Sequence, residues 1–216
     1  MKYPHAVKGV KKLFVASLFE IISTLMVIAS AVLLVMAGND ANSPLLTPAG
    51  TLALVAGIPL LVAFILQLVG LIQAKADERS FGTALWLILL ALILTVVSSI
   101  FSMVATSWSV YFSSTLSAVS TAFNACVVLY VLAGIIKLAD DVGENSYASR
   151  GRVLRIVLLV LFIVSVGMHL ISTFVNPNAE VTKIMTYVSM GASIVELVAH
   201  IWYFFYLARA GKKLSK

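Results

Sequence analysis

Charged residues are scarce in this chain of 216 residues, where Asp, Glu, Lys and Arg together make up 11% of the sequence. Ordinary soluble domains contain about 25%. Hydrophobic residues make up 61%, compared with roughly 45–50% in soluble domains. A globule of this length has no interior large enough to bury so many apolar side chains. The composition therefore excludes a soluble protein for the chain as a whole and predicts that most side chains face lipid.

Cysteine and catalytic motifs are also nearly absent. Cys126 is the only cysteine, so no disulfide can form within the chain. Glu196 and His200 form an E-x-x-x-H pair without the first histidine of a zinc hydrolase, and no glycine-rich phosphate loop is present. Ser193 follows Gly191 in a G-x-S pattern, but the closing glycine of a serine nucleophile motif is missing. We therefore predict no enzymatic activity, no cofactor and no metal site.

Long apolar stretches are what the sequence has in abundance. Six of them are long enough to cross a hydrocarbon core of about 30 Å. They cover residues 13–37, 50–74, 84–107, 113–136, 153–175 and 183–208. In lipid each backbone group needs a partner within the chain, and the alternating pattern of barrel strands is absent, so these stretches predict helices. We predict an all-α, polytopic transmembrane bundle of six helices, forming a single integral membrane domain over residues 1–216.

The six helices pair into three hairpins, and an internal repeat is one interpretation of the sequence. Lys8-Gly9, Phe81-Gly82 and Arg150-Gly151 each precede an odd-numbered helix. Three parallel two-helix repeats would produce this pattern. The alternative is that leucine-rich helices match one another by composition alone.

The basic residues are distributed very unevenly between the two sides of the predicted bundle. Fourteen of the fifteen lie in four segments that the topology places on one side: the N-terminal segment, the 75–83 loop, residues 137–155 and the C-terminal tail. The alternate loops contain none, and Lys183 lies at the boundary of the last one. Since basic loops stay in the cytoplasm, we predict a multi-pass protein of the cell membrane with cytoplasmic N- and C-termini.

The same distribution predicts partners. The basic residues lie between apolar runs and not on one face, so we expect no nucleic acid as a partner. The partner expected for the whole chain is the lipid bilayer. We expect anionic lipids of the inner leaflet to contact the four N-terminal lysines. These are Lys2, Lys8, Lys11 and Lys12.

Aromatic residues near the ends of the stretches predict the two membrane interfaces, where aromatic rings accumulate. Trp108, Tyr111 and Phe112 are expected at the outer interface. The inner interface is expected to hold four aromatic residues. They are Trp86, Trp202, Tyr203 and Tyr206.

Polar side chains inside the apolar stretches form the candidate site, because burying polar groups in lipid is costly. The predicted intramembrane polar site consists of Glu20, Gln67, Asn124, Glu196 and His200. Glu196 and His200 are four residues apart and share a helix face. One hypothesis is that these residues bind or transport a small solute or proton through the bundle. The alternative is a non-catalytic scaffold or accessory subunit, whose polar residues bond neighbouring helices and whose helix faces contact a membrane protein partner.

Small residues recur every four positions on two of the predicted helices. One row is Ser113, Ser117, Thr121 and Ala125, and the other is Ala53 and Gly57. Such rows allow helix backbones to approach closely, so we predict packing surfaces. The alternative is a hydrophilic wall that faces a cavity.

Overall fold

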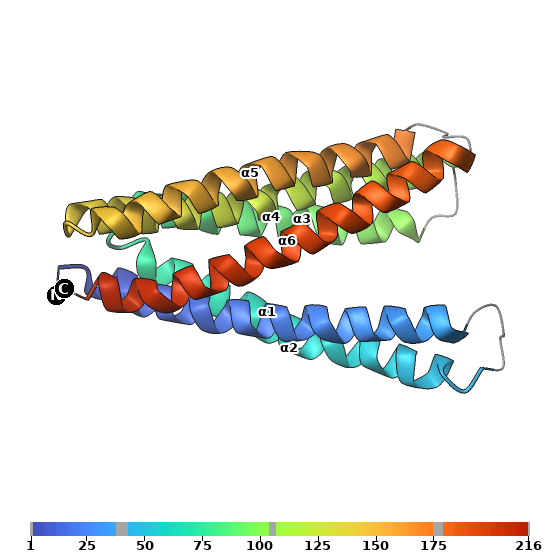
Figure 1. Ribbon diagram of the computed structural model, residues 1–216, viewed down its shortest axis with the longest axis horizontal. Coiled ribbons are helices and arrows are strands. Elements are labelled where there is room, and N and C mark those ends of the chain that lie inside the picture. The colour runs from blue at the N-terminus through green and yellow to red at the C-terminus, as the bar shows by residue number, and fades with distance from the viewer. Residues whose placement is uncertain (1, 38–42, 104–106, 175–178, 216) are drawn as a thin grey trace.

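The computed structural model describes residues 2–37, 43–103, 107–174 and 179–215. Within these ranges, side chains are described except at residues 35, 107, 110, 169, 170, 172–174, 179–194 and 196. The described chain forms six helices and no strand (Figure 1). They are α1 (Pro4–Ala37), α2 (Leu46–Ala74), α3 (Arg79–Ser102), α4 (Ser107–Asp141), α5 (Asn145–Phe174) and α6 (Ala179–Lys213). The predicted all-α bundle is confirmed.

Five of these helices are long and apolar enough to cross a membrane. The qualifying segments are Pro4–Leu34, Leu46–Ala74, Arg79–Ser102, Tyr111–Asp141 and Asn145–Met168. The sixth predicted span, residues 183–208, falls on α6, whose N-terminal side chains lie outside the described residues. Large apolar side chains on the outside of the bundle are exposed: Leu54 is 82% exposed and Trp86 is 70% exposed. Such a surface is unsuited to water, so lipid is the medium around the helices.

The helices extend beyond the apolar stretches at most ends, because a helix continues its backbone bonds into the polar headgroup region while the apolar run stops there. α1 begins at Pro4 and not near residue 13, and α6 continues to Lys213. One predicted boundary is wrong because the helix is shorter than the apolar stretch. The third span was expected to reach residue 107, but α3 ends at Ser102. The turn residue Met103 is itself apolar, so hydropathy does not mark this helix end.

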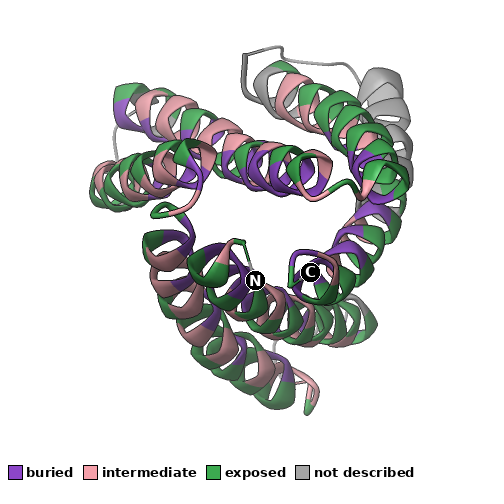
Figure 2. Cartoon of the chain, turned by 90° about the vertical axis from the view of Figure 1, so that its left-hand side faces the viewer, coloured by how far each residue is buried: buried purple, intermediate pink, exposed green. Residues whose placement is uncertain are grey.

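The six helices form a closed ring with an up-and-down topology. Each helix packs against its neighbours in the sequence, and α6 also packs against α1. Viewed along the helices, they surround a central space (Figure 2). Both chain termini lie at the same end of the bundle, here called the termini end, and the opposite end is called the far end (Figure 1).

The α1–α2 pair has the most extensive helix contact, and two glycines allow it. A Cβ atom added at Gly70 would lie 2.9 Å from the carbonyl oxygen of Gly9, so the two backbones approach too closely for a side chain. Gly151 similarly gives room to the ring and hydroxyl of Tyr206. Gly82 has no close neighbour except Lys75 Cβ at 3.8 Å. The three glycines of the suggested repeat therefore have different environments, which favours the compositional explanation of their spacing.

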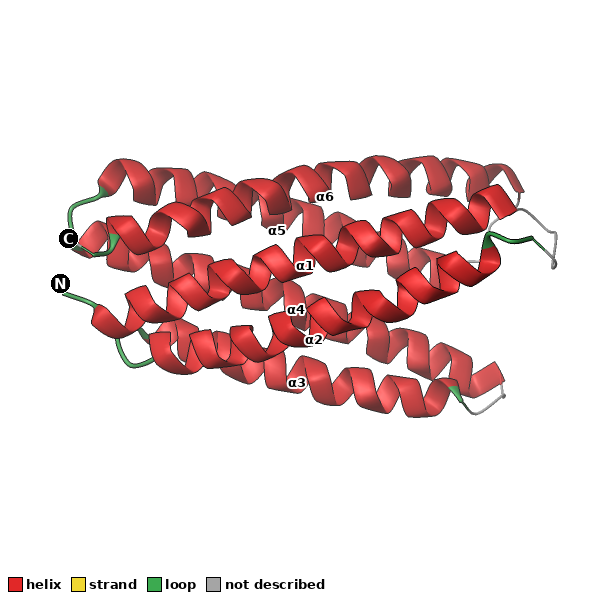
Figure 3. Cartoon of the chain, turned by 90° about the horizontal axis from the view of Figure 1, so that it is seen from below, coloured by secondary structure: helices red, strands yellow, loops and turns green. Residues whose placement is uncertain are grey.

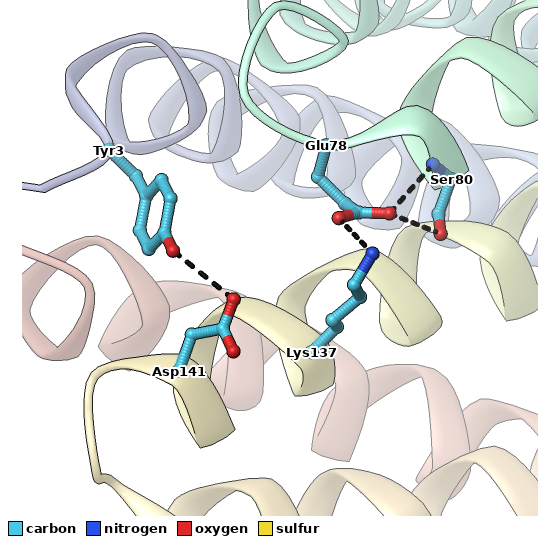
Figure 4. A network of polar contacts seen from close by, with 5 residues as sticks. All are labelled: Tyr3, Glu78, Ser80, Lys137 and Asp141. Atoms are coloured by element: carbon cyan, nitrogen blue, oxygen red, sulfur yellow. Dashed lines mark hydrogen bonds and ion pairs between the residues drawn. The ribbon is translucent and has the colours of Figure 1, made fainter.

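The termini end is tied together by its acidic residues (Figure 4). Asp77 Oδ2 accepts a hydrogen bond of 2.7 Å from the backbone N–H of Ala6 and so caps the first turn of α1 from the turn between α2 and α3. Lys137 Nζ lies 2.8 Å from Glu78 Oε2, and Tyr3 donates a 3.1 Å hydrogen bond to Asp141. These contacts join α1, α3 and α4.

Two further ion pairs at this end join α4 to α5, and α6 to the α4–α5 turn. Arg152 lies 2.6 Å from Asp140, and Lys213 lies 2.9 Å from Glu144. The other basic residues at the termini end form no ion pair with the described residues. They are Lys8, Lys11, Lys12, Lys75, Arg79, Arg150, Arg155, Arg209 and Lys212. The termini end therefore keeps a large excess of positive charge.

Candidate functional site

A cavity of about 780 Å³ lies inside the ring, and all six helices line it. Its volume is within the range of about 300–1,000 Å³ that is typical of sites for small molecules. The ring topology creates this cavity because each helix packs mainly against its two neighbours and leaves the centre open.

The two ends of the cavity differ. Toward the termini end it is lined by the buried apolar side chains of Leu13, Leu71 and Ile88. Toward the far end its lining residues, such as Thr24 and Thr95, are exposed. In the same direction the α1–α2 hairpin diverges from the other four helices (Figure 1). The cavity is therefore closed toward the termini end and opens toward the far end.

Four of the five predicted polar site residues line this single cavity: Glu20 on α1, Gln67 on α2, Asn124 on α4 and His200 on α6. The side chain of the fifth, Glu196, lies outside the described residues. The four residues span most of the chain length, so only the ring arrangement brings them to one place.

Glu20 and Gln67 form the polar contact at the centre of this group. Gln67 Nε2 donates a hydrogen bond to Glu20 Oε1 across the α1–α2 pair. Asn124 is exposed to the cavity, and its amide forms no hydrogen bond with the described residues. The ring of His200 packs edge-on against Phe162, with 6.4 Å between the ring centroids. The site thus combines a carboxylate, two amides and an imidazole.

The hydroxyl groups of the cavity contribute less polarity than their number suggests. Thr24 donates to the carbonyl oxygen of Glu20, Thr95 to that of Ala91 and Thr121 to that of Ser117, each at 2.9–3.0 Å. These donors are used within their own helices. Most of the remaining wall is aliphatic or aromatic. The wall of the cavity is therefore mainly apolar, and its polar part consists mainly of Glu20, Gln67, Asn124 and His200.

Tyr203 and Tyr206 were predicted at the membrane interface, and this prediction is wrong. Tyr203 lines the cavity and is 7% exposed, and Tyr206 is stacked on Tyr147 inside the bundle with ring centroids 4.4 Å apart. The neighbouring Trp202 is 40% exposed on the outside. The direction in which each ring points depends on the rotation of α6 about its own axis.

Helical spacing contained a further signal that the sequence interpretation missed. Leu13, Ser17, Glu20 and Thr24 recur every three to four residues and form the face of α1 that lines the cavity. On α6, the spacing of three residues places Tyr203 on the same face as His200. Ser17, Thr24 and Tyr203 belong to the cavity wall and were absent from the predicted site.

The predicted packing rows of small residues are only partly used for packing. Ser113 accepts a hydrogen bond of 2.8 Å from Ser98 through its carbonyl oxygen, which joins α4 to α3. Thr121 and Ala125, later in the same row, line the cavity. Gly57 also lines the cavity, and a Cβ atom added there would meet no described atom within 4 Å. The packing interpretation is therefore wrong for Gly57, which leaves space and does not fill a helix contact.

Metal ligation has no support among the described side chains, where no three His, Cys, Asp or Glu residues gather closely enough to hold an ion. No protein-family model, curated protein or solved structure matches the chain. The fold and its apolar outer surface nevertheless define a class: the chain is a helical membrane protein.

Proposed function

We propose that the protein binds a small solute in its central cavity. The observation that carries this proposal is the convergence of Glu20, Gln67, Asn124 and His200, from four helices, on one cavity. In a scaffold, polar side chains serve separate helix contacts. Serines take that structural role in this chain: Ser23 and Ser30 of α1 each donate a 2.8 Å hydrogen bond to a carbonyl oxygen of α2. In the cavity, Glu20 and Gln67 bond to each other across α1 and α2, and Asn124 and His200 reach the same space from α4 and α6. This convergence supports the solute hypothesis over the accessory one.

A solute fits the cavity better than a proton path does. A proton path needs polar groups or water that continue to both faces of the membrane. Toward the termini end the lining includes Leu13, Leu71 and Ile88, whose side chains are 5%, 0% and 3% exposed, and the hydroxyl-bearing Tyr203 there is also buried, at 7% exposed. A cavity that is closed on one side and open on the other is the geometry of a binding site.

Native mass spectrometry of the gently solubilised protein tests the proposal. We expect a small molecule to be retained by the wild type and lost in Gly57→Phe, because the added ring would fill the cavity without a clash at Cβ. Gly50→Phe is the matched control. Gly50 lies two turns away on α2, has open space around it and does not line the cavity. Equal retention by wild type and Gly57→Phe, or no retained molecule in either, would contradict the proposal.

We also propose that the termini end faces the cytoplasm and binds anionic lipid. Lys8, Lys11 and Lys12 share one face of α1 by their spacing and form no ion pair with described residues. Lys2 is placed differently, because its Nζ donates a 3.2 Å hydrogen bond to the carbonyl oxygen of Asp141. Replacing Lys8, Lys11 and Lys12 together by glutamine is expected to reduce the retention of phosphatidylglycerol more than replacing Lys2 alone by glutamine.

A further inference from the structure

We infer that the solute of the central cavity is a hydrophobic organic cation, whose positive group lies at Glu20 and whose apolar body lies against the cavity wall. This inference rests on the proposed function and specifies the chemical class of the ligand. It follows from the charge of the cavity, the chemistry of its walls and its opening.

The charge of the cavity is carried by few groups. The titratable side chains among its described lining residues are Glu20, His200 and Tyr203, and these described residues include no lysine or arginine. Gln67 donates one hydrogen bond to Glu20 but supplies no charge. A carboxylate removed from water is costly unless a positive charge pairs with it. A cationic ligand would supply that charge, whereas an anionic ligand would add repulsion in a low-dielectric site.

The walls determine the rest of the ligand. The cavity is also lined by Leu60 and Phe64 of α2, by Val128 of α4 and by Phe162 of α5. Aromatic faces attract organic cations, and aliphatic walls favour an apolar body.

A bare inorganic ion is a poor match for the same walls. Hard cations need several oxygen ligands. Among the described lining residues only Glu20 supplies an anionic oxygen, and the neutral amide and hydroxyl oxygens are spread over six helices among aliphatic and aromatic side chains. A ligand with a single positive group and a large apolar surface satisfies both parts of the cavity.

Two probes of almost equal size and opposite charge separate the possibilities. Tetraphenylphosphonium carries a permanent positive charge and tetraphenylborate a permanent negative one, so neither titrates. Equilibrium dialysis against purified protein, with empty detergent micelles as the blank, is expected to show saturable binding of the cation and none of the anion. Gly57→Phe is expected to abolish binding of the cation, and Gly50→Phe to preserve it.

Substitution of Glu20 then tests the role of the carboxylate. Glu20→Gln is expected to weaken binding of the cation at least about tenfold, because it removes the buried opposite charge. Glu20→Asp keeps the negative charge and is expected to keep the preference for the cation over the anion. This second variant still tests the role of the charge if Glu20→Gln does not fold. Binding of both probes alike, or unchanged binding of the cation by a folded Glu20→Gln protein, would overturn the inference.

The two proposals fail in distinguishable ways. If neither probe binds, but native mass spectrometry shows a neutral or anionic molecule that Gly57→Phe loses, the cavity binds a solute and the cationic class is wrong. If neither probe binds and no molecule is retained, both the cationic class and the solute-binding function are wrong.

Discussion

Glu20 is held in place by a residue 47 positions away in the sequence, and this contact illustrates the cost of a carboxylate inside an apolar bundle. Gln67 supplies a hydrogen bond that replaces one formerly made by water. The pair has two consequences at the scale of single residues. It fixes the direction of the carboxylate toward the cavity, and it makes each partner dependent on the other for stability.

The first prediction concerns this pair. Gln67→Leu is expected to destabilise the protein by about 1–3 kcal/mol, because it leaves the Glu20 oxygen without its donor. The double variant Glu20→Leu/Gln67→Leu is expected to recover most of the loss, since both polar groups are then removed together. Thermal unfolding in detergent measures both. A melting temperature of Gln67→Leu equal to that of the wild type would show that the hydrogen bond contributes nothing.

The second prediction concerns Glu78, which lies outside the membrane-spanning segments. Burial opposes ionisation of its carboxyl group, but hydrogen bonds from Lys137 and from the backbone and hydroxyl of Ser80 outweigh burial and lower the pKa of Glu78. Because the pKa of Glu78 is lower in the folded protein, the contact stabilises at pH values above the unfolded-state pKa of about 4.3. This contribution is lost as the pH falls through the folded value.

Unfolding measured from pH 7 to pH 3 in the wild type and in Glu78→Gln tests this prediction. The stability difference between the two proteins is expected to be present at pH 7 and to vanish at the acidic end. Its size is expected to be modest, under about 1 kcal/mol, because Lys137 is 62% exposed. A difference that grows as the pH falls would contradict the assigned direction of the pKa.

At the scale of helices, the α1–α2 pair has the most extensive contact in the bundle and defines one wall of the cavity. Its crossing point is the glycine pair Gly9 and Gly70 near the termini end. The two helices of the hairpin lie side by side (Figure 3), and the hairpin diverges from the other helices toward the far end (Figure 1). The shape of the site therefore depends on residues that do not line it.

The third prediction follows from that crossing point. Gly9→Ala is expected to destabilise the protein by about 1–3 kcal/mol, because the new methyl group would overlap backbone atoms of α2. Gly50→Ala on the same hairpin is the control and is expected to be neutral or to stabilise by about 0.5–1 kcal/mol, since alanine favours helix. Thermal unfolding compares the two variants. Equal effects would mean that the close approach is not required.

At the scale of the whole molecule, the ring separates an outer surface of exposed apolar side chains from an inner wall that holds the polar ones. The termini end carries the basic excess that remains after the acidic residues of that end have formed their contacts. One end of the molecule is thus strongly positive, and the cavity opens toward the other. If the positive end is cytoplasmic, the cavity is accessible from the opposite side of the membrane.

The fourth prediction tests this orientation by labelling single cysteines in a Cys126→Ala background. Cysteines introduced at Asp40 and Val110 are expected to react with an impermeant reagent added outside intact cells. Cysteines at Lys75 and Asn145 are expected to react only after the cells are opened. Labelling at position 145 from outside would reverse the assigned topology.

The sequence by itself determined the class of protein, the number of helices and the end at which the basic residues gather. Each of these depends on local composition, because a chain in lipid must satisfy its backbone within each segment whatever its neighbours are. The sequence also predicted four residues of the cavity. Each could be recognised without knowledge of its neighbours, because a polar side chain inside an apolar stretch is unusual, as at Glu20 and Gln67.

Tertiary structure alone decided what those residues face. Tyr203 and Trp202 are adjacent, yet one lines the cavity and the other is exposed on the outside. Gly57 and Gly70 lie on one helix, yet one borders open space and the other a backbone crossing. The rotation of each helix about its own axis is fixed by packing against its neighbours. Since all the apolar faces of a membrane helix are acceptable to lipid, hydropathy contains little information on that rotation, and the cavity exists only once the ring has closed.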